Sequence, residues 1–219
     1  SGEGCDSLVD TPEQRADQTD DGAGGNVVGN YATLNPLSSQ GGTLSNGNLA
    51  YTGSNNNFAT IAVSSGKWYW EITNTGTLDN NNNTFLVGVT NNIYDTGTFS
   101  DKIQFYAQAS QSAIYRNSGS AVETFSGTTL ANGDVLGLAL DLDSGTQAIQ
   151  FYKNGSAIGS STFLNNDNQT WSPSVKNALA SLAINFGQRP FHTAAPAGYK
   201  SLNTANLPTP TIAAGNQYF

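Results

Sequence analysis

GDVLGLALDLDSGTQAIQFYKNGSAIG, residues 133–159, is the stretch that decides the fold of this chain. Four leucines occupy every second position in its first half: Leu136, Leu138, Leu140 and Leu142. This period of two places the leucines on one face of a β-strand, opposite a face of small residues. Residues 143–145 (DSG) then favour a turn, and 148–152 resume an extended pattern. Asn154-Gly155 suits a type I′ hairpin turn, because both residues tolerate positive φ. The stretch therefore predicts a core strand, a turn, a second strand and a tight hairpin.

Further strands are predicted on both sides of this hairpin. In Lys67–Ile72 (KWYWEI), both tryptophans and the isoleucine share a face opposite Tyr69 and Glu71. Each tryptophan can bury on the order of 200 Å², so this is a core strand. Before it, the segment 30–37 offers Tyr31, Leu34 and Leu37 as anchors lying across a sheet. Other extended patterns occupy residues 58–63, 85–89, 103–109, 113–116 and 181–186.

The fold class follows from the number of strands and the absence of alternating helical patterns. We expect an all-β domain of two antiparallel sheets packed face to face as a jelly-roll-like sandwich. A closed barrel is the alternative, and periodicity alone does not separate the two. At 219 residues the chain can hold one such domain with tails. We expect an acidic flexible leader over residues 1–25, the sandwich domain over 26–200, and a C-terminal tail or linker over 201–219.

Charge and composition exclude several classes of partner. The net charge is −8, and only 11% of residues are charged, which suits an extracellular or particle-surface β protein. Up to Asp21 there are seven acidic residues and one basic residue, a charge of −6, and the remaining nine acidic and seven basic residues give −2. No basic stripe exists to neutralise phosphates, so we expect no nucleic-acid partner. The chain contains no run of about 18 apolar residues, so we expect no membrane insertion. Cys5 is the only cysteine, so no disulfide within the chain is possible.

Five motifs in order give the chain a family resemblance. They are GKWYWE (66–71), FLVGV (85–89), GDVLGLALDLD (133–143), FYKNG (151–155) and NFG (185–187). Together they resemble the SPRY domain over about residues 43–200. The resemblance implies a concanavalin A-like β-sandwich whose function is non-catalytic recognition through loops at one end.

The flanking segments narrow the resemblance. NYATLNPL (30–37), FGQRPF (186–191) and ANLPTPTI (205–212) look like SPRY-containing structural proteins of bacteriophages, which are large tail or fibre components. This likeness implies a virion location, outside the cell, and a host surface glycan or protein as the ligand. It also implies contacts with other virion subunits, and it leaves open a homotrimer of the full-length protein. The alternative is a purely structural virion module that binds no host ligand.

The side chains that carry out most catalysis are sparse. A glycan-degrading enzyme on this kind of sandwich needs two converging carboxylates, whereas Glu71 and Glu123 are isolated in the sequence. His192 is the only histidine, and we expect it to have a surface or packing role. Asp141 and Asp143 could bind calcium, but hydrogen bonding to turn N–H groups is the commoner use of such a pair. We therefore predict no catalytic residue, no metal ligand and no cofactor, and we keep a glycan-degrading enzyme as the least favoured alternative.

Exposed aromatic residues beside polar loops are the best binding candidates. Sugars stack on aromatic faces, and protein partners are anchored by Tyr, Trp and Arg. The sequence places the following residues near strand or loop ends: Tyr94, Tyr106, Tyr115, Arg116 and Trp171. Asp79 and Asn81, in a polar loop, are predicted to form the rim of the same ligand-binding site.

Overall fold

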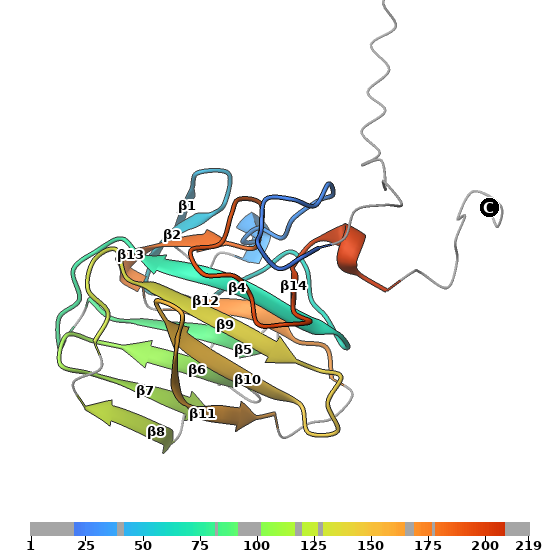
Figure 1. Cartoon of the computed structure of the whole chain (residues 1–219). Coiled ribbons are helices and arrows are strands. Elements are labelled where there is room, and N and C mark those ends of the chain that lie inside the picture. Colours follow the sequence, from blue (N-terminus) through green and yellow to red (C-terminus); the bar gives the residue numbers. More distant parts are fainter. Residues whose placement is uncertain are drawn as a thin grey trace, which may run out of the picture.

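Two antiparallel sheets packed face to face form the body of the molecule (Figure 1). The computed structural model describes residues 20–38, 42–81, 83–91, 102–116, 120–126, 129–164, 169–176 and 178–208. Within these residues the helical structure consists of two short 3₁₀ turns, η1 (Pro36–Ser38) and η2 (Thr204–Asn206). No helix in the described residues is long and apolar enough to cross a membrane. The predicted sandwich is confirmed.

The larger sheet has eight strands in the order β1-β2-β13-β4-β9-β10-β11, with β14 paired to β4. The central pair, β4 and β9, aligns Trp70 with Leu138. The bounds of its strands are β1 (Thr43–Ser45), β2 (Ala50–Gly53), β4 (Lys67–Asn74), β9 (Val135–Asp141), β10 (Ala148–Lys153), β11 (Ser156–Phe163), β13 (Ala178–Asn185) and β14 (Lys200–Ser201).

The smaller sheet has six strands in the order β3-β12-β5-β6-β7-β8. β5 and β6 pair Val87 with Phe105, and β6 and β7 pair Phe105 with Ile114. These three side chains therefore share the inner face of the sheet. The bounds of its strands are β3 (Asn57–Phe58), β5 (Phe85–Thr90), β6 (Lys102–Ala107), β7 (Gln111–Arg116), β8 (Ser120–Ser126) and β12 (Ser172–Lys176).

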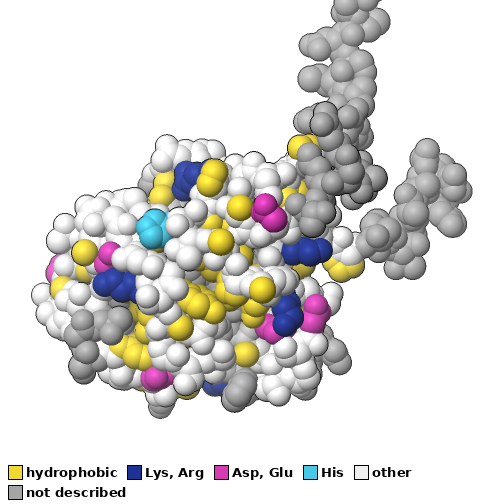
Figure 2. Space-filling model, viewed as in Figure 1, with side chains coloured by type: hydrophobic (Ala, Val, Ile, Leu, Met, Phe, Trp, Pro, Cys, Tyr) yellow, Lys and Arg dark blue, Asp and Glu magenta, His cyan; other side chains and the backbone are white. Residues whose placement is uncertain are grey.

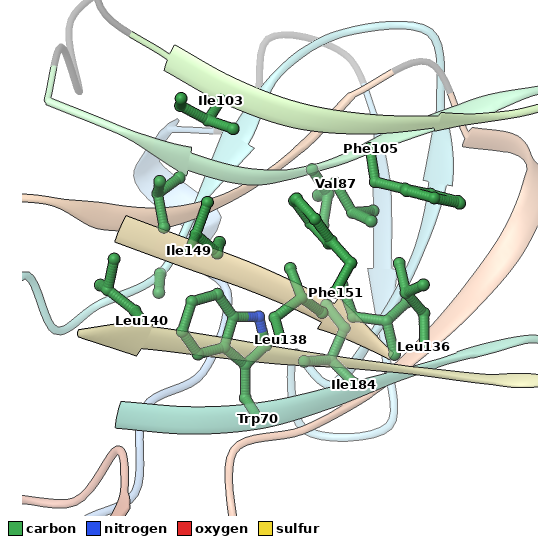
Figure 3. Packing of buried hydrophobic residues seen from close by; sticks show 14 of the residues in the cluster. Trp70, Val87, Ile103, Phe105, Leu136, Leu138, Leu140, Ile149, Phe151 and Ile184 are labelled. Atoms are coloured by element: carbon green, nitrogen blue, oxygen red, sulfur yellow. The ribbon is translucent and has the colours of Figure 1, made fainter. Parts of the chain in front are cut away.

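The core lies between the sheets and is made of alternate residues of the facing strands. Figure 3 shows side chains of both sheets meeting in this layer, with Trp70 and Leu138 on one side and Val87 and Phe105 on the other. Trp70, Leu138 and Phe105 are each no more than 1% exposed. The alternation of large apolar residues thus fixed which face of each strand is buried, as the sequence predicted.

The hairpins follow the turn chemistry of the sequence. Between β10 and β11, Asn154 and Gly155 have φ of 48° and 85°, as a type I′ turn requires. Between β1 and β2, Asn46 and Gly47 also have positive φ. The Asn154-Gly155 turn was predicted from its sequence.

Both chain ends in the described region pack on the larger sheet. We call residues 187–208 the C-terminal strap. Asp20 Oδ2 accepts hydrogen bonds from Ser201 N at 2.7 Å and from Asn206 Nδ2 at 2.7 Å. The N–H groups of Gly25 and Phe191 bond across the same contact to Gly187 O and Ala23 O. Residues 20–25 and 201–208, which lie outside the expected domain bounds of 26 and 200, thus make hydrogen bonds with each other and with residues of the domain. Residues 1–19 and 209–219 lie outside the described part.

Two local expectations were wrong. The predicted strand over residues 58–63 is reduced to β3, and Ala59 and Val63 form only isolated bridges, with Leu34 and Trp171. The proposed anchor Leu37 is 95% exposed, whereas Leu34 is fully buried. The chain turns into η1 directly after Leu34, so the two leucines cannot face the same way.

Candidate functional site

Two of the predicted binding residues meet on the outer face of the smaller sheet. Tyr106 in β6 is opposite Ala113, and Tyr115 in β7 is opposite Gln104, so the two tyrosines are diagonal neighbours. Their rings meet edge to face, with centroids 5.7 Å apart and an interplanar angle of 83°. Both side chains are half-buried. Each ring fixes the orientation of the other while part of it stays in contact with solvent.

The β6–β7 turn connects the tyrosine pair to the polar loop that precedes β5. Ala109 N donates to Asp79 O at 3.1 Å, and Ser110 N donates to Asn80 Oδ1 at 3.0 Å. The same turn holds Gln108, whose Oε1 accepts the Tyr106 hydroxyl at 3.0 Å. The loop, the turn and the tyrosine pair therefore form one connected surface. We call it the tyrosine face, defined by residues 79–81, Tyr106, 108–110 and Tyr115.

The carboxylate of Asp79 accepts hydrogen bonds from other residues of this loop. Its Oδ1 accepts the N–H groups of Asn81 at 2.7 Å and Asn83 at 2.9 Å, and its Oδ2 accepts Asn83 Nδ2 at 3.0 Å. Asn80 and Asn81 are exposed. Asp79 thus holds the loop in shape, and the side chains of Asn80 and Asn81 are exposed to solvent.

The remaining predicted site residues do not join this surface. Trp171 is 2% exposed and belongs to the core, so it is not available to a ligand. Arg116 follows Tyr115 in β7 and points to the opposite face of the strand. Tyr94 lies outside the described residues. Gln108 and Ser110 were missed, although the polar run between two extended patterns in the sequence could have indicated a turn there.

The outer face of the larger sheet carries a second apolar cluster that the sequence did not reveal. Figure 2 shows hydrophobic side chains gathered over the middle of this face, where the strap crosses the sheet. Tyr69, Ala139 and Phe191 are buried there, and the rings of Tyr69 and Phe191 meet edge to face at 4.9 Å. Tyr152, Ala195 and Tyr199 are partly buried against them. The cluster is a small core beneath the strap.

The buried carboxylate of Glu71 holds the strap over this cluster. Its Oε2 accepts His192 N at 2.8 Å, and its Oε1 accepts Thr193 N at 3.0 Å. The Tyr69 hydroxyl donates to the same Oε1 at 3.2 Å. Burial, followed by the nearby Glu71 charge, raises the pKa of Tyr69. Both carboxylate oxygens of Glu71 are thus engaged in structural hydrogen bonds.

A cation–π contact joins Tyr199 of the strap to an ion pair of the larger sheet. Lys67 Nζ lies 2.8 Å from Asp141 Oδ2 and 5.7 Å from the centre of the Tyr199 ring. Partial burial acts to raise the pKa of Asp141, but hydrogen bonds from Lys67, Ser144 and the backbone outweigh it and lower the pKa to about 2. Burial first, and then the Asp141 charge, raises the pKa of Tyr199 to about 12.

The residues considered for catalysis and metal binding have structural partners. Asp141 Oδ1 accepts the N–H groups of Asp143 and Ser144, and Asp143 Oδ1 accepts Gly66 N at 2.6 Å, the turn role that the sequence predicted. His192 is exposed, and its Nδ1 lies 3.2 Å from Thr193 Oγ1. In the described ranges no three His, Cys, Asp or Glu side chains gather in a way that could hold a metal ion.

A family model and one solved structure agree with this architecture. A family model described as "SPRY domain" matches residues 67–189. The crystal structure of the SPRY domain of human HERC1 is similar with a TM-score of 0.51 and 21% identity, covering 69% of this chain and 96% of that one. The TRIM65 PSpry domain aligns with a TM-score of 0.48 and 17% identity, covering 71% of this chain and 88% of that one. The comparison with curated protein sequences gave no significant match.

Proposed function

Since this chain belongs to the SPRY domain family, whose domains are in general non-catalytic interaction modules, we propose that it recognises a protein partner through the tyrosine face. One observation carries the proposal. The Tyr106–Tyr115 pair lies on an outer sheet surface, connected through the β6–β7 turn to a loop that its own hydrogen bonds hold in shape.

The chemistry of this face suits protein recognition. Tyr, Asn and Ser are the residues that binding loops use most, because tyrosine supplies contact area at low cost in side-chain entropy and amides adapt their hydrogen bonds. A loop that is already ordered loses little freedom on binding, which favours affinity. Two tyrosines with half-buried rings can act as anchors at the centre of such an interface.

The finer proposal places the module in the tail or fibre of a bacteriophage, where it binds a host surface protein. The flanking segments that look like phage structural proteins support this setting, as does the near-neutral domain. A host glycan is the second candidate ligand, because tyrosine rings beside amides also suit sugars. A shallow face buries little of a ligand, so each copy binds weakly, and useful attachment needs several copies, as a homotrimer would provide.

Binding of the whole chain, as monomer and as an artificial trimer, to bacterial surface-protein extracts and to a glycan array tests the proposal. We expect the Tyr106→Ala/Tyr115→Ala variant to lose at least tenfold in binding. The control His192→Ala changes an exposed side chain of the strap, which covers the larger sheet, and should bind as the unchanged chain does. Raising the salt concentration should have little effect, because the only charged side chain of the face, Asp79, is engaged within its loop.

Each outcome separates the alternatives. Binding only on the glycan array would replace the protein ligand by a sugar. Absence of binding, even as a trimer, would favour the structural virion module. Release of reducing sugar ends during the assay would overturn the non-catalytic assignment, and full binding by the double alanine variant would place the site elsewhere on the domain.

A further inference from the structure

A groove opens along one side of the sandwich, between the last strands of the two sheets. β11 ends the larger sheet and β8 ends the smaller one, and the two strands lie side by side at the lower edge of the molecule (Figure 1). The groove has a volume of about 490 Å³. Residues of β8, the β10–β11 hairpin and the start of β11 line it: Phe125, Lys153, Asn154, and Ser156–Gly159.

Among the described residues, no strand pairs with β11 on the groove side. Ser156 pairs with Lys153 across a two-residue turn, so these two residues exchange their hydrogen bonds within the hairpin. Bonding alternates along an antiparallel pair, and Ala157 therefore directs its N–H and C=O away from β10. Natural edge strands usually carry Lys, Pro or an inward charge that prevents further pairing. None of the residues of β11 is charged or proline.

A side chain of β8 limits the open edge at its far end. Glu123 Oε2 accepts the N–H of Ser160 at 3.3 Å, in the place where another strand would offer a carbonyl. Gly159 leaves room for this contact, because a Cβ there would lie 2.6 Å from Glu123 Oε2 and 2.6 Å from the Phe125 ring. The part of the edge open to pairing is therefore residues 156–159.

The floor of the groove is aromatic, and Lys153, the one charged residue among those that line it, is paired. Phe151, Phe105 and Phe125 form a row from the core outward, with centroids 5.5 Å and 6.4 Å apart. Phe125 is half-buried, so the row ends at the groove. Lys153 Nζ is 3.0 Å from Asp134 Oδ2 and also donates to Thr129 O. Since Lys153 is paired with Asp134, it offers little attraction to an acidic ligand.

We propose that residues 156–159 of β11 bind an extended, uncharged peptide segment of another protein as an added strand. Its backbone pairs with Ala157, and one of its large apolar side chains enters the groove beside Phe125, where it extends the aromatic row. Backbone pairing supplies affinity and the groove supplies selectivity for the apolar residue. This site is separate from the tyrosine face and does not depend on it.

The test begins with selection of a random nonapeptide library against the whole chain. Enriched peptides should be uncharged, alternate in pattern and carry a large apolar residue near the centre. Their affinity should fall at least tenfold for Ala157→Pro, which removes the outward N–H, and for Phe125→Ala, which removes the floor. Tyr106→Ala should bind within twofold of the unchanged chain, so failure here is distinct from failure at the tyrosine face.

Chemically modified peptides test the same backbone pairing without any change to the protein. N-methylation of the alternate amides that face β11 should abolish binding, and methylation of the intervening amides should leave it intact. This arm decides the matter if Ala157→Pro does not fold. No enriched peptide, equal loss at both sets of amides, or selected peptides that bind Phe125→Ala unchanged would overturn the proposal. The proposal would also be overturned if light scattering showed a dimer of the unchanged chain and a monomer of Ala157→Pro. The edge would then pair with a second copy of the chain.

Discussion

Leu138 shows at the scale of one residue how alternation decides burial. It is fully buried and faces Trp70 and Phe151 through the pairing of β9 with β4 and β10. Leu138→Ala should lower the free energy of unfolding by about 2–5 kcal/mol, since it removes apolar contacts and leaves a cavity. Leu37→Ala is the matched control, because Leu37 is 95% exposed and should change stability by less than about 0.5 kcal/mol. Urea denaturation measures both, and equal effects would contradict the packing described here.

Gly137 shows why the outer face of β9 is made of small residues. A Cβ at this position would lie 2.4 Å from the Tyr69 hydroxyl, which is held by Glu71. Gly137→Ala should therefore destabilise the domain by about 1–3 kcal/mol through overpacking. Gly145→Ala places the same methyl group where no atom lies within 4 Å, and should change stability by less than about 0.5 kcal/mol. Calorimetry compares the two variants. If Gly137→Ala were neutral, Tyr69 and the strap above it would have to shift at little cost in free energy.

Single residues also mark the limit of prediction from sequence. The pairing of Tyr106 with Tyr115 agrees with alternation, which directed both outward. Trp171 carries no such signal, because it precedes β12 and its burial depends on a bridge to Val63, more than a hundred residues earlier. Asp79 was chosen as a ligand residue, yet its hydrogen bonds close its own loop. A polar residue in a loop has the same appearance in sequence whether it faces inward or outward.

At the scale of elements, strongly alternating strands were predictable and the coverings of the sheets were not. β4, β5 and β9 appeared where large apolar residues recur at every second position. β8 was missed, because Val122 is 50% exposed and the strand offers only one large inward apolar residue, Phe125. Only residues 201–208 of the strap were predicted as part of a tail, because that segment has no period. The order of the strap comes from side chains of other segments, above all Glu71 and Asp20.

The strap should respond to alkaline pH through Tyr199. The pKa of Tyr199 in the fold is about 12, above its ordinary value of 10.0, so the folded protein favours the protonated ring. The resulting stabilisation is complete below pH 10 and is lost as the pH rises toward 12. The free energy of unfolding should thus fall more steeply between pH 9.5 and 11 for the unchanged chain than for Tyr199→Phe. Urea denaturation across this range measures both slopes, and equal slopes would show that the Tyr199 hydroxyl is not buried in solution.

At the scale of the whole molecule, the order of strands in the sheets lies beyond local pattern. β4 is flanked by β9 and β13, both of them far away along the chain. Nothing in the alternation of any one strand names these neighbours. The resemblance to a known family favoured a sandwich over a closed barrel. The order of the strands became known only from the structure. The charge distribution, by contrast, was readable at once, and it separates an acidic start from a domain that is close to neutral.

The boundary of that acidic start is where deletions should distinguish the folded domain from its leader. The N–H groups of Gly22, Ala23 and Gly25 and the carboxylate of Asp20 take part in hydrogen bonds. Backbone bonds tie the same three residues to the strap. Removal of residues 1–19 should change the melting temperature by less than about 2 °C, as the composition of that segment predicts. Removal of residues 1–25 should lower it by more than about 4 °C, because the strap loses its partners, a cost of roughly 1–2 kcal/mol. Scanning calorimetry of both truncations compares them directly. Equal melting temperatures would mean that the strap holds its place without the N-terminal segment, leaving Glu71 as its main anchor.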